Sequence, residues 1–503
     1  MSSQEPVFEF PIRFDDEGGH GGRTHRLHEQ LRAAILDGRL AAGAALPSTR
    51  QAAAGLGIAR NSVIAAYDLL IAEGYVVPRA GARAVVADIA ARVHTRLQPR
   101  RDVGGDARLN PQWRAPHEHL PPPRVLPPRS FRLGVPEHRH FPHDVWRRLM
   151  AQSLRTWSKT AFGYPPSQGI PVLREAIARH VAFARAVACT AEDIVVTSGA
   201  QQAFDLLARL LVTPGQTTVA VEEPGYPPVR AAFAAAGARL VSIPVDDEGL
   251  CVEKLPPGIR VISVTPSHQS PTGVALSLQR RAALLDYAQA HDAVIIEDDY
   301  DGEFRYGGRP LDALQTLDRE ARVFYVGTFS KSLFPSLRKG FVVVPAWARE
   351  GFIAVKHVAD SHCDTITQSV LAAFIRDGHL ARHVRRMRPV YAARRDALLA
   401  GITTELSPWL QPIPSEAGLH LAARIRDPAQ AERIIAKARQ HLPGAQSIAE
   451  YAASPPEQPG LVFGFGVIDE EEIAPALKQL RKALQGGQVQ QAKRGTASRS
   501  DAG

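Results

Sequence analysis

The sequence contains few cysteines, few lysines and no long apolar segment. Its 503 residues include three cysteines and nine lysines. Cys189, Cys251 and Cys363 lie far apart, without the spacing of a disulfide framework or a metal site, as is typical of a reducing compartment. There is no signal-peptide pattern and no apolar run approaching about eighteen residues, so we expect a cytoplasmic protein with no membrane role.

Length and charge divide the chain into parts. A chain of 503 residues exceeds one ordinary hydrophobic core, which predicts at least two domains. The net charge of +9 is uneven: residues 22–101 hold twelve Arg, no Lys and five acidic residues, whereas residues 1–21 form an acidic lead. Clustered arginines favour a polyanionic partner, because neutralised phosphates release counterions. A solvated basic face is the alternative that charge alone leaves open.

Apolar spacing predicts a small helical domain over residues 22–88. Leu27, Leu31 and Ile35 recur every four residues in 26–37, which indicates an amphipathic helix. Further helices are predicted at 47–55 and 59–73, followed by short strands at 75–77 and 84–86. This order of elements is that of a winged helix-turn-helix.

Four short motifs in this region resemble the DNA-binding domain of the GntR family. They lie at 36–40 (LDGRL), 46–50 (LPSTR), 60–63 (RNSV) and 72–75 (AEGY). Arginine can bind guanine through two hydrogen bonds, asparagine can bind adenine, and hydroxyls bind phosphates. A helical interaction module that binds no DNA is the alternative. The resemblance implies contacts to double-stranded operator DNA by Ser48, Thr49, Arg50, Arg60, Asn61, Ser62 and, in the wing, Arg79 and Arg83.

Two features depart from the GntR pattern. Ala59 stands where a serine usually caps the third helix, a difference worth about 1 kcal/mol of helix stability. The wing lacks the usual Gly-Ser-Gly-Thr, so its contacts are the least supported of the predicted set.

Composition separates the remaining parts of the chain. Residues 89–128 are rich in arginine and proline and predict an extended linker. Residues 485–503 are polar and lack apolar periodicity, which predicts a disordered tail. Residues 129–484 alternate strand-like and helical segments, as in a mostly parallel sheet whose strand ends carry the functional site. Its strands are predicted at 194–197, 218–221, 261–265, 293–297 and 323–326.

Lys331 lies in the most informative setting of any lysine in the chain. It follows the apolar strand 323–326, has the hydroxyls of Thr328 and Ser330 beside it, and precedes Arg338 by seven residues. A lysine so placed can form a Schiff base with an aldehyde while its neighbours bind phosphate, as a pyridoxal 5'-phosphate (PLP) site requires. A basic loop after a buried strand is the alternative.

Other strand ends supply matching side chains. Asp298 and Tyr300 follow a buried strand; a carboxylate can keep a pyridine nitrogen protonated, and a phenol can hydrogen-bond a ring oxygen. Tyr226, after the turn 224–225, is suited to stack on a flat ring. A metal-binding acidic cluster is the competing interpretation, which we disfavour because no histidine or further carboxylate follows at ligand spacing. We therefore predict no metal.

Six ordered motifs resemble the fold-type I aminotransferases. They lie at 163–164, 198–201, 224–226, 266–273, 298–300 and 330–338. Behind a GntR-like domain, they make the chain resemble the MocR subfamily of bacterial regulators. The implied fold is a winged helix-turn-helix followed by an α/β aminotransferase-like domain with a smaller C-terminal α/β subdomain.

The resemblance also implies a role for each site residue. Lys331 would be the Schiff-base lysine, Asp298 the partner of the pyridine nitrogen, and Tyr300 the partner of the ring hydroxyl, while Tyr226 would stack on the ring. Such sites lie at a homodimer interface, so Tyr164 would reach the neighbouring subunit's cofactor. The phosphate would be held by Gly199, Ala200, Gln201, Thr328, Ser330 and Arg338.

Two departures from the aminotransferase pattern bear on function. Ser270 replaces the usual Asn before Pro-x-Gly, and residues 460–466 lack the arginine that commonly binds a substrate carboxylate. We therefore expect a dimeric transcription regulator that senses PLP or a small amine and modulates operator binding, rather than an enzyme. A catalytically active aminotransferase with a DNA-binding appendage is the rival; a third reading takes PLP itself as the signal and vitamin B6 genes as the target.

Overall fold

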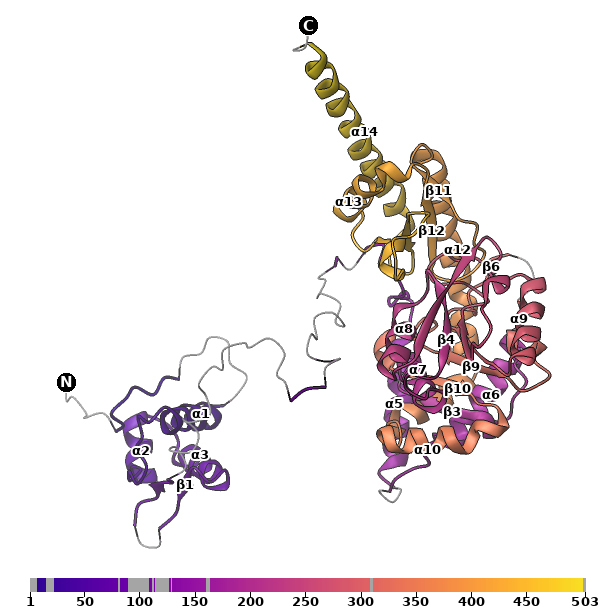
Figure 1. The fold of residues 1–503 in the computed structure, drawn as a ribbon. Helices are drawn as coiled ribbons and strands as arrows, with labels where there is room; N and C mark the ends of the chain where they lie inside the picture. The colour runs from indigo at the N-terminus through magenta and orange to yellow at the C-terminus, as the bar shows by residue number, and fades with distance from the viewer. Residues whose placement is uncertain are drawn as a thin grey trace. The chain divides into compact units, whose positions relative to one another are not determined.

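The computed structural model describes residues 7–14, 22–79, 82–88, 108–110, 113, 126–127, 129–159, 163–307 and 311–500, with the backbone alone for 487–500. The chain divides into two units, 1–116 and 117–503, whose elements are coloured and labelled in Figure 1. No helix among the described residues is long and apolar enough to cross a membrane. Most of the predicted linker 89–128 lies outside the described residues.

The N-terminal unit has the predicted order of helices and strands. Leu27, Leu31 and Ile35 are all buried on one face of the first helix. The second helix begins with a capping box, in which the Ser48 hydroxyl accepts from Gln51 N. The elements are α1 (Arg23–Leu36), α2 (Thr49–Leu56), α3 (Arg60–Ala72) and the antiparallel pair β1 (Val76–Val77) and β2 (Val85–Val86).

The described part of the N-terminal lead packs on this unit. Phe8 is 5% exposed and belongs to the same apolar cluster as the helices, with Val7, Phe10, Ile12 and Phe14 packed against it. The backbone of Arg13 exchanges hydrogen bonds with the Gln30 side chain, at 2.9 and 2.8 Å. The sequence predicts a separate acidic lead over 1–21; within it, the described residues 7–14 pack on the first unit through their apolar side chains.

The C-terminal unit contains an eight-stranded mixed sheet in the order β3-β10-β9-β8-β7-β4-β5-β6. Neighbouring strands from β9 to β5 are parallel, as predicted, whereas β10, which the sequence analysis missed, runs antiparallel to both its neighbours. The strands are β3 (Ile194–Thr197), β4 (Thr218–Glu223), β5 (Arg239–Asp246), β6 (Gly249–Leu250), β7 (Val261–Val264), β8 (Val294–Asp299), β9 (Val323–Thr328) and β10 (Gly340–Val343).

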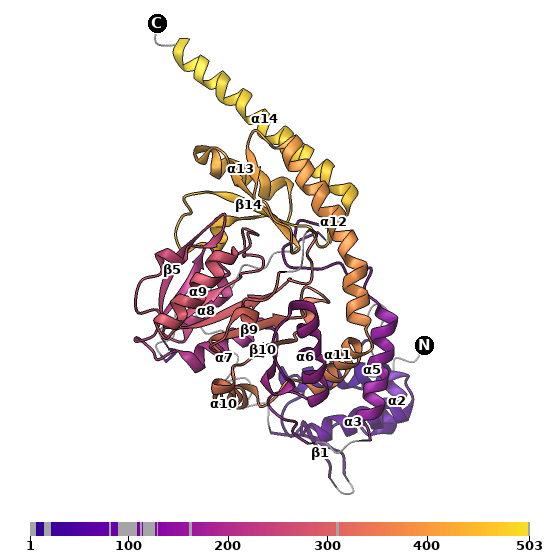
Figure 2. The same cartoon turned by 90° about the vertical axis from the view of Figure 1, so that its right-hand side faces the viewer.

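Helices cover both faces of this sheet (Figure 2). Alternate residues of one strand face opposite layers: Phe341 and Val343 belong to the apolar cluster that includes α6, whereas Val342 packs with α7. Burial on both faces explains why the strands read as continuous apolar runs. The helices are α5 (His143–Trp157), α6 (Pro171–Arg185), α7 (Ala200–Leu211), α8 (Pro227–Ala235), α9 (Leu278–Ala290), α10 (Arg349–Asp360) and α11 (Thr365–Arg376).

A smaller subdomain follows, as the resemblance implies. Its four-stranded antiparallel sheet has the order β11-β12-β14-β13, with α13 (Ala431–His441) and the long helices α12 (His379–Glu405) and α14 (Glu470–Ser500) beside it. The strands are β11 (Leu410–Pro412), β12 (His420–Ile425), β13 (Gln446–Ser447) and β14 (Gly460–Gly464).

The described backbone is helical over much of 485–503, where the sequence predicts a disordered tail. Helix α14 continues to Ser500, with Ile473, Leu477, Leu480 and Leu484 buried along its first part. The packed part removes the cost of helix nucleation, and Gln, Ala, Lys and Arg residues favour propagation, although Gly486, Gly487 and Gly495 oppose it. Helix formation there needs no apolar face, which was the signal the prediction relied on.

Candidate functional site: a cofactor cavity and a winged helix

One cavity of about 570 Å³ in the C-terminal unit brings most of the predicted cofactor residues together. Gly199 borders it beside Arg338, whereas Tyr164 lines a different cavity and is 92% exposed. The predicted residues lining the first cavity are Ala200, Gln201, Tyr226, Asp298, Tyr300, Thr328, Ser330, Lys331 and Arg338.

The parallel strands explain this convergence. Asp298 lies near the end of β8 and Thr328 is the last residue of β9; the two strands are paired, with Asp298 opposite Val326. Carboxyl ends of parallel strands meet at one edge of a sheet, where ligands of α/β folds bind. Lys331 comes three residues after the end of β9 and so lies at the same edge.

The Lys331 amine is partly buried and held by a backbone acceptor. Its Nζ donates to Gly134 O at 2.9 Å. Burial lowers the pKa of this amine and Arg338 adds to that effect, while the carboxyl groups of Asp301 and Asp298 oppose it. A lowered pKa increases the fraction of neutral amine, the form that attacks an aldehyde.

Asp298 carries a buried oxygen, Oδ1, that has no hydrogen-bond partner in the described part of the chain. Burial, with Asp299 and Asp301 nearby, raises the pKa of this carboxyl well above its ordinary value. An orphaned buried acceptor calls for a donor; a protonated ring nitrogen would supply both the hydrogen bond and a positive charge. The donor set therefore fits PLP.

The opposite end of the cavity can bind an anion. Helix α7 begins at Ala200, and Gly199 before it has a φ of +81° that favours glycine. A Cβ at Gly199 would lie 3.0 Å from Arg338 Cζ, so the guanidinium packs directly on the helix N-terminus. Arg338 Nη2 donates to Ser198 O at 2.9 Å, and Thr328 Oγ1 lies 3.1 Å from Ser330 Oγ. Backbone amides, hydroxyls and a guanidinium together suit a phosphate.

A buried chain of polar groups, missed by the sequence analysis, orients Tyr300. His268 Nδ1 lies 3.1 Å from both carboxylate oxygens of Asp301 and 3.1 Å from Tyr300 Oη. The ring of His420 lies tilted beside that of His268, 4.5 Å away between centroids, and burial lowers the pKa of His420 to about 3. Ligand-type atoms of His268, Asp301 and His420 lie within 4.8 Å of one another, so the fold supplies the histidines that sequence spacing lacked. Hydrogen bonds make His268 and Asp301 the support of the phenol, whereas His420 Nε2 lies 3.1 Å from Pro271 O.

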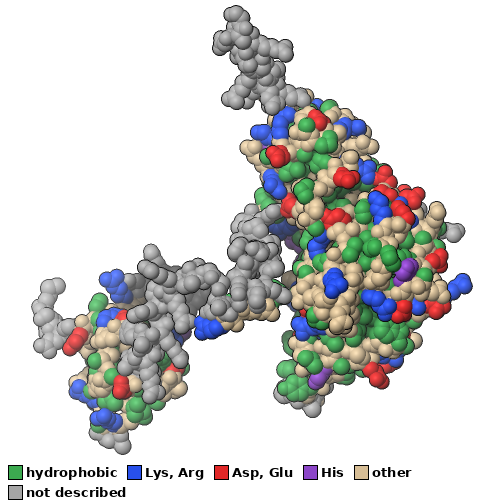
Figure 3. Space-filling view, in the orientation of Figure 1, with side chains coloured by type: hydrophobic (Ala, Val, Ile, Leu, Met, Phe, Trp, Pro, Cys, Tyr) green, Lys and Arg blue, Asp and Glu red, His purple; other side chains and the backbone are tan. Residues whose placement is uncertain are grey.

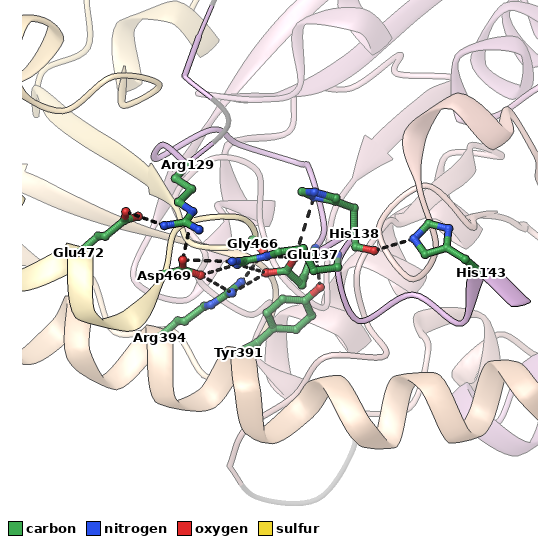
Figure 4. Close-up of polar contacts among 10 residues, drawn as sticks. Arg129, Glu137, His138, His143, Tyr391, Arg394, Gly466, Asp469 and Glu472 are labelled. Carbon is green, nitrogen blue, oxygen red and sulfur yellow. Dashed lines mark hydrogen bonds and ion pairs between the residues drawn. The ribbon is translucent and has the colours of Figure 1, made fainter.

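The segment before α5 is held in place by ion pairs (Figure 4). Glu137 is 1% exposed and accepts from Arg394 Nη2 at 2.6 Å and Arg139 Nη2 at 2.8 Å. Its backbone N donates to Tyr391 Oη at 2.9 Å, and Arg139 also pairs with Asp469. These bonds tie the segment to α12 and to the loop before α14, which fixes one wall of the cavity.

The subdomain strand β14, with the sequence GLVFG, contains no arginine that could bind a substrate carboxylate. Val462 is buried in an apolar cluster with Ile413 and Ile448. Two arginines are found among the described residues lining the cavity: Arg338 at the anion seat, and Arg132, which the sequence analysis did not single out.

The predicted DNA-contacting residues lie on α2, α3 and the wing. Arg50, Arg60 and Asn61 are exposed, and Arg60 Nε donates to Thr49 Oγ1 at 3.4 Å, which joins the two helices. Arg79 and Arg83 are exposed on either side of 80–81, which lie outside the described residues. Figure 3 shows blue side chains, which in this unit are all arginines, scattered among other side chains on the visible face.

The structure also shows the state of three smaller side chains at this surface. Ser48 is engaged in its capping box, since its hydroxyl lies 3.0 Å from Gln51 Oε1. Ser62 is half-buried in the first turn of α3. Ala59, at the N-cap of that helix, provides no side-chain cap, as predicted.

Comparisons with known proteins cover both units. A family model described as aminotransferase class I and II matches residues 131–449, and one described as bacterial regulatory proteins, gntR family, matches residues 23–86. Together they account for the two-part architecture.

Similar proteins include regulators and enzymes. The chain is 38% identical to the probable rhizopine catabolism regulatory protein MocR of Rhizobium meliloti over 92% of this chain and 93% of that protein. It is 32% identical to the HTH-type pyridoxine biosynthesis transcriptional regulator PdxR of Corynebacterium glutamicum over 91% and 95%. The α-aminoadipate aminotransferase of Thermus thermophilus, solved with N-(5'-phosphopyridoxyl)-L-leucine, has a TM-score of 0.63 and 28% identity over 71% of this chain and 92% of that one.

The fold and its cavity define a PLP-dependent, aminotransferase-like domain joined to a DNA-binding domain. The chain belongs to the MocR subfamily of GntR-type transcription regulators. Pyridoxal phosphate is the cofactor of this fold, and the orphaned Asp298 oxygen and the anion seat fit it.

Proposed function

We propose that this regulator binds PLP covalently at Lys331 and that occupancy of the cavity, by PLP alone or with an amino compound, changes operator binding by the winged helix. The observation that carries the proposal is the complete cofactor cavity on the same chain as a GntR domain. The missing arginine of β14 supports a sensory rather than a fully catalytic role.

Each cavity residue contributes one physical task. When bound, PLP supplies an aldehyde and an electron-withdrawing ring. The neutral amine of Lys331 binds that aldehyde, Asp298 holds a proton at the ring nitrogen, and Tyr300, oriented by His268, donates toward the ring oxygen. Tyr226 covers the ring, and burial raises its pKa to about 12, so it stays a neutral phenol. The phosphate is held by Gly199, Ala200, Gln201, Thr328, Ser330 and Arg338.

DNA binding is assigned to the winged helix. The N-terminal turn of α3 presents Arg60, Asn61 and Ser62 for the major groove, with Ser48, Thr49 and Arg50 toward phosphates and Arg79 and Arg83 in the wing. A ligand alters such binding only if it favours one arrangement of the protein over another. In a dimer, the arrangement that a ligand could change is the spacing and orientation of the two winged helix domains.

We propose that the protein is a homodimer through its aminotransferase-like domain. Large apolar side chains are exposed on this unit, including Trp157 on α5, Tyr164 after it, and Phe183 on α6. Exposed apolar patches commonly mark interfaces. In this arrangement Tyr164 would reach the cofactor of the partner, which accounts for its distance from its own cavity.

The test is DNA binding with and without PLP. Fluorescence anisotropy of DNA from upstream of the gene's own coding region would be measured at two salt concentrations, with the wild type, Lys331→Ala and Asn61→Ala. We expect PLP to change the wild-type affinity severalfold and the Lys331→Ala affinity not at all. Asn61→Ala should weaken specific binding by about 1–3 kcal/mol without altering PLP uptake. Sequence-independent binding, or an equal PLP effect on Lys331→Ala, would overturn the proposal.

A further inference from the structure

We propose that Arg132 anchors the acidic group of the effector, so that the cavity takes an amine bearing a carboxylate or sulfonate rather than a simple amine. The inference rests on the proposed function, because it requires PLP at Lys331. It assigns the chemical class of the ligand, which the motifs leave open.

Arg132 lies in the same cavity as the reactive amine. Both Arg132 and Lys331 line it, and the second cavity arginine, Arg338, packs against Gly199 at the phosphate seat. With Arg338 committed to the phosphate, Arg132 is the cation left for an incoming anion among the described lining residues.

The charge of Arg132 has no counter-ion among the residues that the structure describes. Its Nη2 donates to the carbonyl oxygen of Leu126 at 3.3 Å, and no carboxylate among the described residues lies within ion-pair distance of it. Nearby arginines differ: Arg129 pairs with Asp469 at 3.2 Å and with Glu472 at 3.3 Å. A guanidinium has five donors in a planar fork that matches a carboxylate or sulfonate. One long bond to a carbonyl leaves most of that capacity unused.

The backbone of Arg132 is fixed close to the reaction centre. Gly134, two residues on, accepts the hydrogen bond from Lys331 Nζ at 2.9 Å. A Cβ at Gly464 of β14 would lie 2.1 Å from Arg132 O, so only glycine permits this close approach. Glu137, three residues after Gly134, ties the segment to α12 through its ion pair with Arg394. The backbone that carries the guanidinium is therefore ordered before a ligand binds, which removes part of the entropy cost of binding.

The location explains how the site works without the usual arginine. In β14 the apolar Val462 lies in a packed cluster, so this strand offers an acidic ligand no cation. Arg132 offers one from the segment before α5 instead, while Gln446 and Tyr451 of the subdomain add polar groups to the cavity lining. An amine that reaches Lys331 would place its acidic group toward this wall.

The test compares acidic amines with their uncharged counterpart. The PLP-loaded full-length protein would be titrated with L-alanine, β-alanine, taurine and ethylamine, and binding followed by the visible absorbance of the cofactor. Ethylamine is each of the other three without its acidic group. We expect at least one acidic amine to bind tenfold or more tightly than ethylamine. Arg132→Gln should weaken that binding by about 10- to 100-fold, the value of a charge-assisted hydrogen bond, while ethylamine binding stays within twofold.

Matched variants separate binding from folding. Arg132→Lys keeps the charge and should restore part of the preference, and Arg129→Gln, on the same segment but paired outside the cavity, should leave it unchanged. Thermal unfolding of each variant controls for stability. A wild type with no preference for acidic amines, or an Arg132→Gln protein that retains it, would overturn the inference. If PLP produces no visible absorbance with the wild type, the proposed function itself fails.

Discussion

Asp298 illustrates how a single side chain can be costly for the fold and necessary for the ligand. Its carboxyl is buried beside Asp299 and Asp301, which raises its pKa, and one oxygen has no described partner. A raised pKa in the folded state means that ionisation at neutral pH opposes folding. Ionisable groups whose pKa is shifted by burial and by neighbouring charges are typical of functional sites.

For Asp298→Asn we therefore predict opposite effects on binding and stability. The neutral amide cannot hold a proton on the ring nitrogen, so the PLP concentration for half-saturation should rise by about 10- to 100-fold. The PLP-free protein should unfold at the same or a higher temperature, because the ionisation penalty is gone. Absorbance titration and thermal unfolding measure the two effects. The control is Asp205→Asn, which removes an exposed carboxylate that pairs with Arg209 on α7. An Asp298→Asn protein with lower stability and unchanged PLP affinity would contradict the prediction.

Among the elements, the segment before α5 depends on ion pairs that the sequence does not reveal. Although burial opposes ionisation of Glu137, hydrogen bonds from Arg139 and Arg394 hold its pKa well below the usual range. Because its folded-state pKa is lowered, Glu137 contributes stability above its unfolded-state pKa of about 4.3. That contribution is lost progressively as pH falls below this value.

Glu137→Gln should lower the free energy of unfolding by about 3–5 kcal/mol at pH 7, because it leaves the buried Arg394 without its main partner. Urea unfolding at pH 7 and below pH 4 would measure this, and the difference from the wild type should narrow in acid. The exposed carboxylate of Glu175, which pairs with Arg179 at 3.7 Å, provides the matched control; its replacement by Gln should cost less than about 1 kcal/mol. A Glu137→Gln protein as stable as this control would show that the network is dispensable.

Helices and strands with regular apolar spacing were predicted from the sequence. Features that depend on contacts with other parts of the fold were not. The helices α1 and α3 and the strands β3, β4, β7, β8 and β9 follow patterns visible in the chain. The strand β10 reads as one more apolar run, and only its neighbours give it an antiparallel direction. Residues 7–14 were assigned by the charges around them, yet their aromatic side chains place them on the first unit.

At the level of the whole molecule, the proposed dimer makes Tyr164 a cofactor residue of its partner. The side chain is 92% exposed in one protomer and should gain a binding role only on assembly. Tyr164→Ala should raise the PLP concentration for half-saturation severalfold while changing the stability of the fold by less than about 0.5 kcal/mol. Sedimentation velocity and absorbance titration would measure these effects.

Leu278→Ala, an exposed apolar residue at the start of α9, is the comparison and should bind PLP as the wild type does. A monomer at micromolar concentration with full PLP affinity, or a Tyr164→Ala variant with unchanged affinity, would remove Tyr164 from the site.

The sequence by itself determined the two-part architecture, the cofactor lysine setting and the absence of an arginine in β14, because these depend on local patterns and short motifs. The tertiary structure alone decided that Arg132 shares a cavity with Lys331, that His268 and Asp301 support Tyr300, and that Glu137 meets Arg394. These partners come from segments far apart in the chain. Their meeting depends on sheet order and packing, which no local pattern encodes.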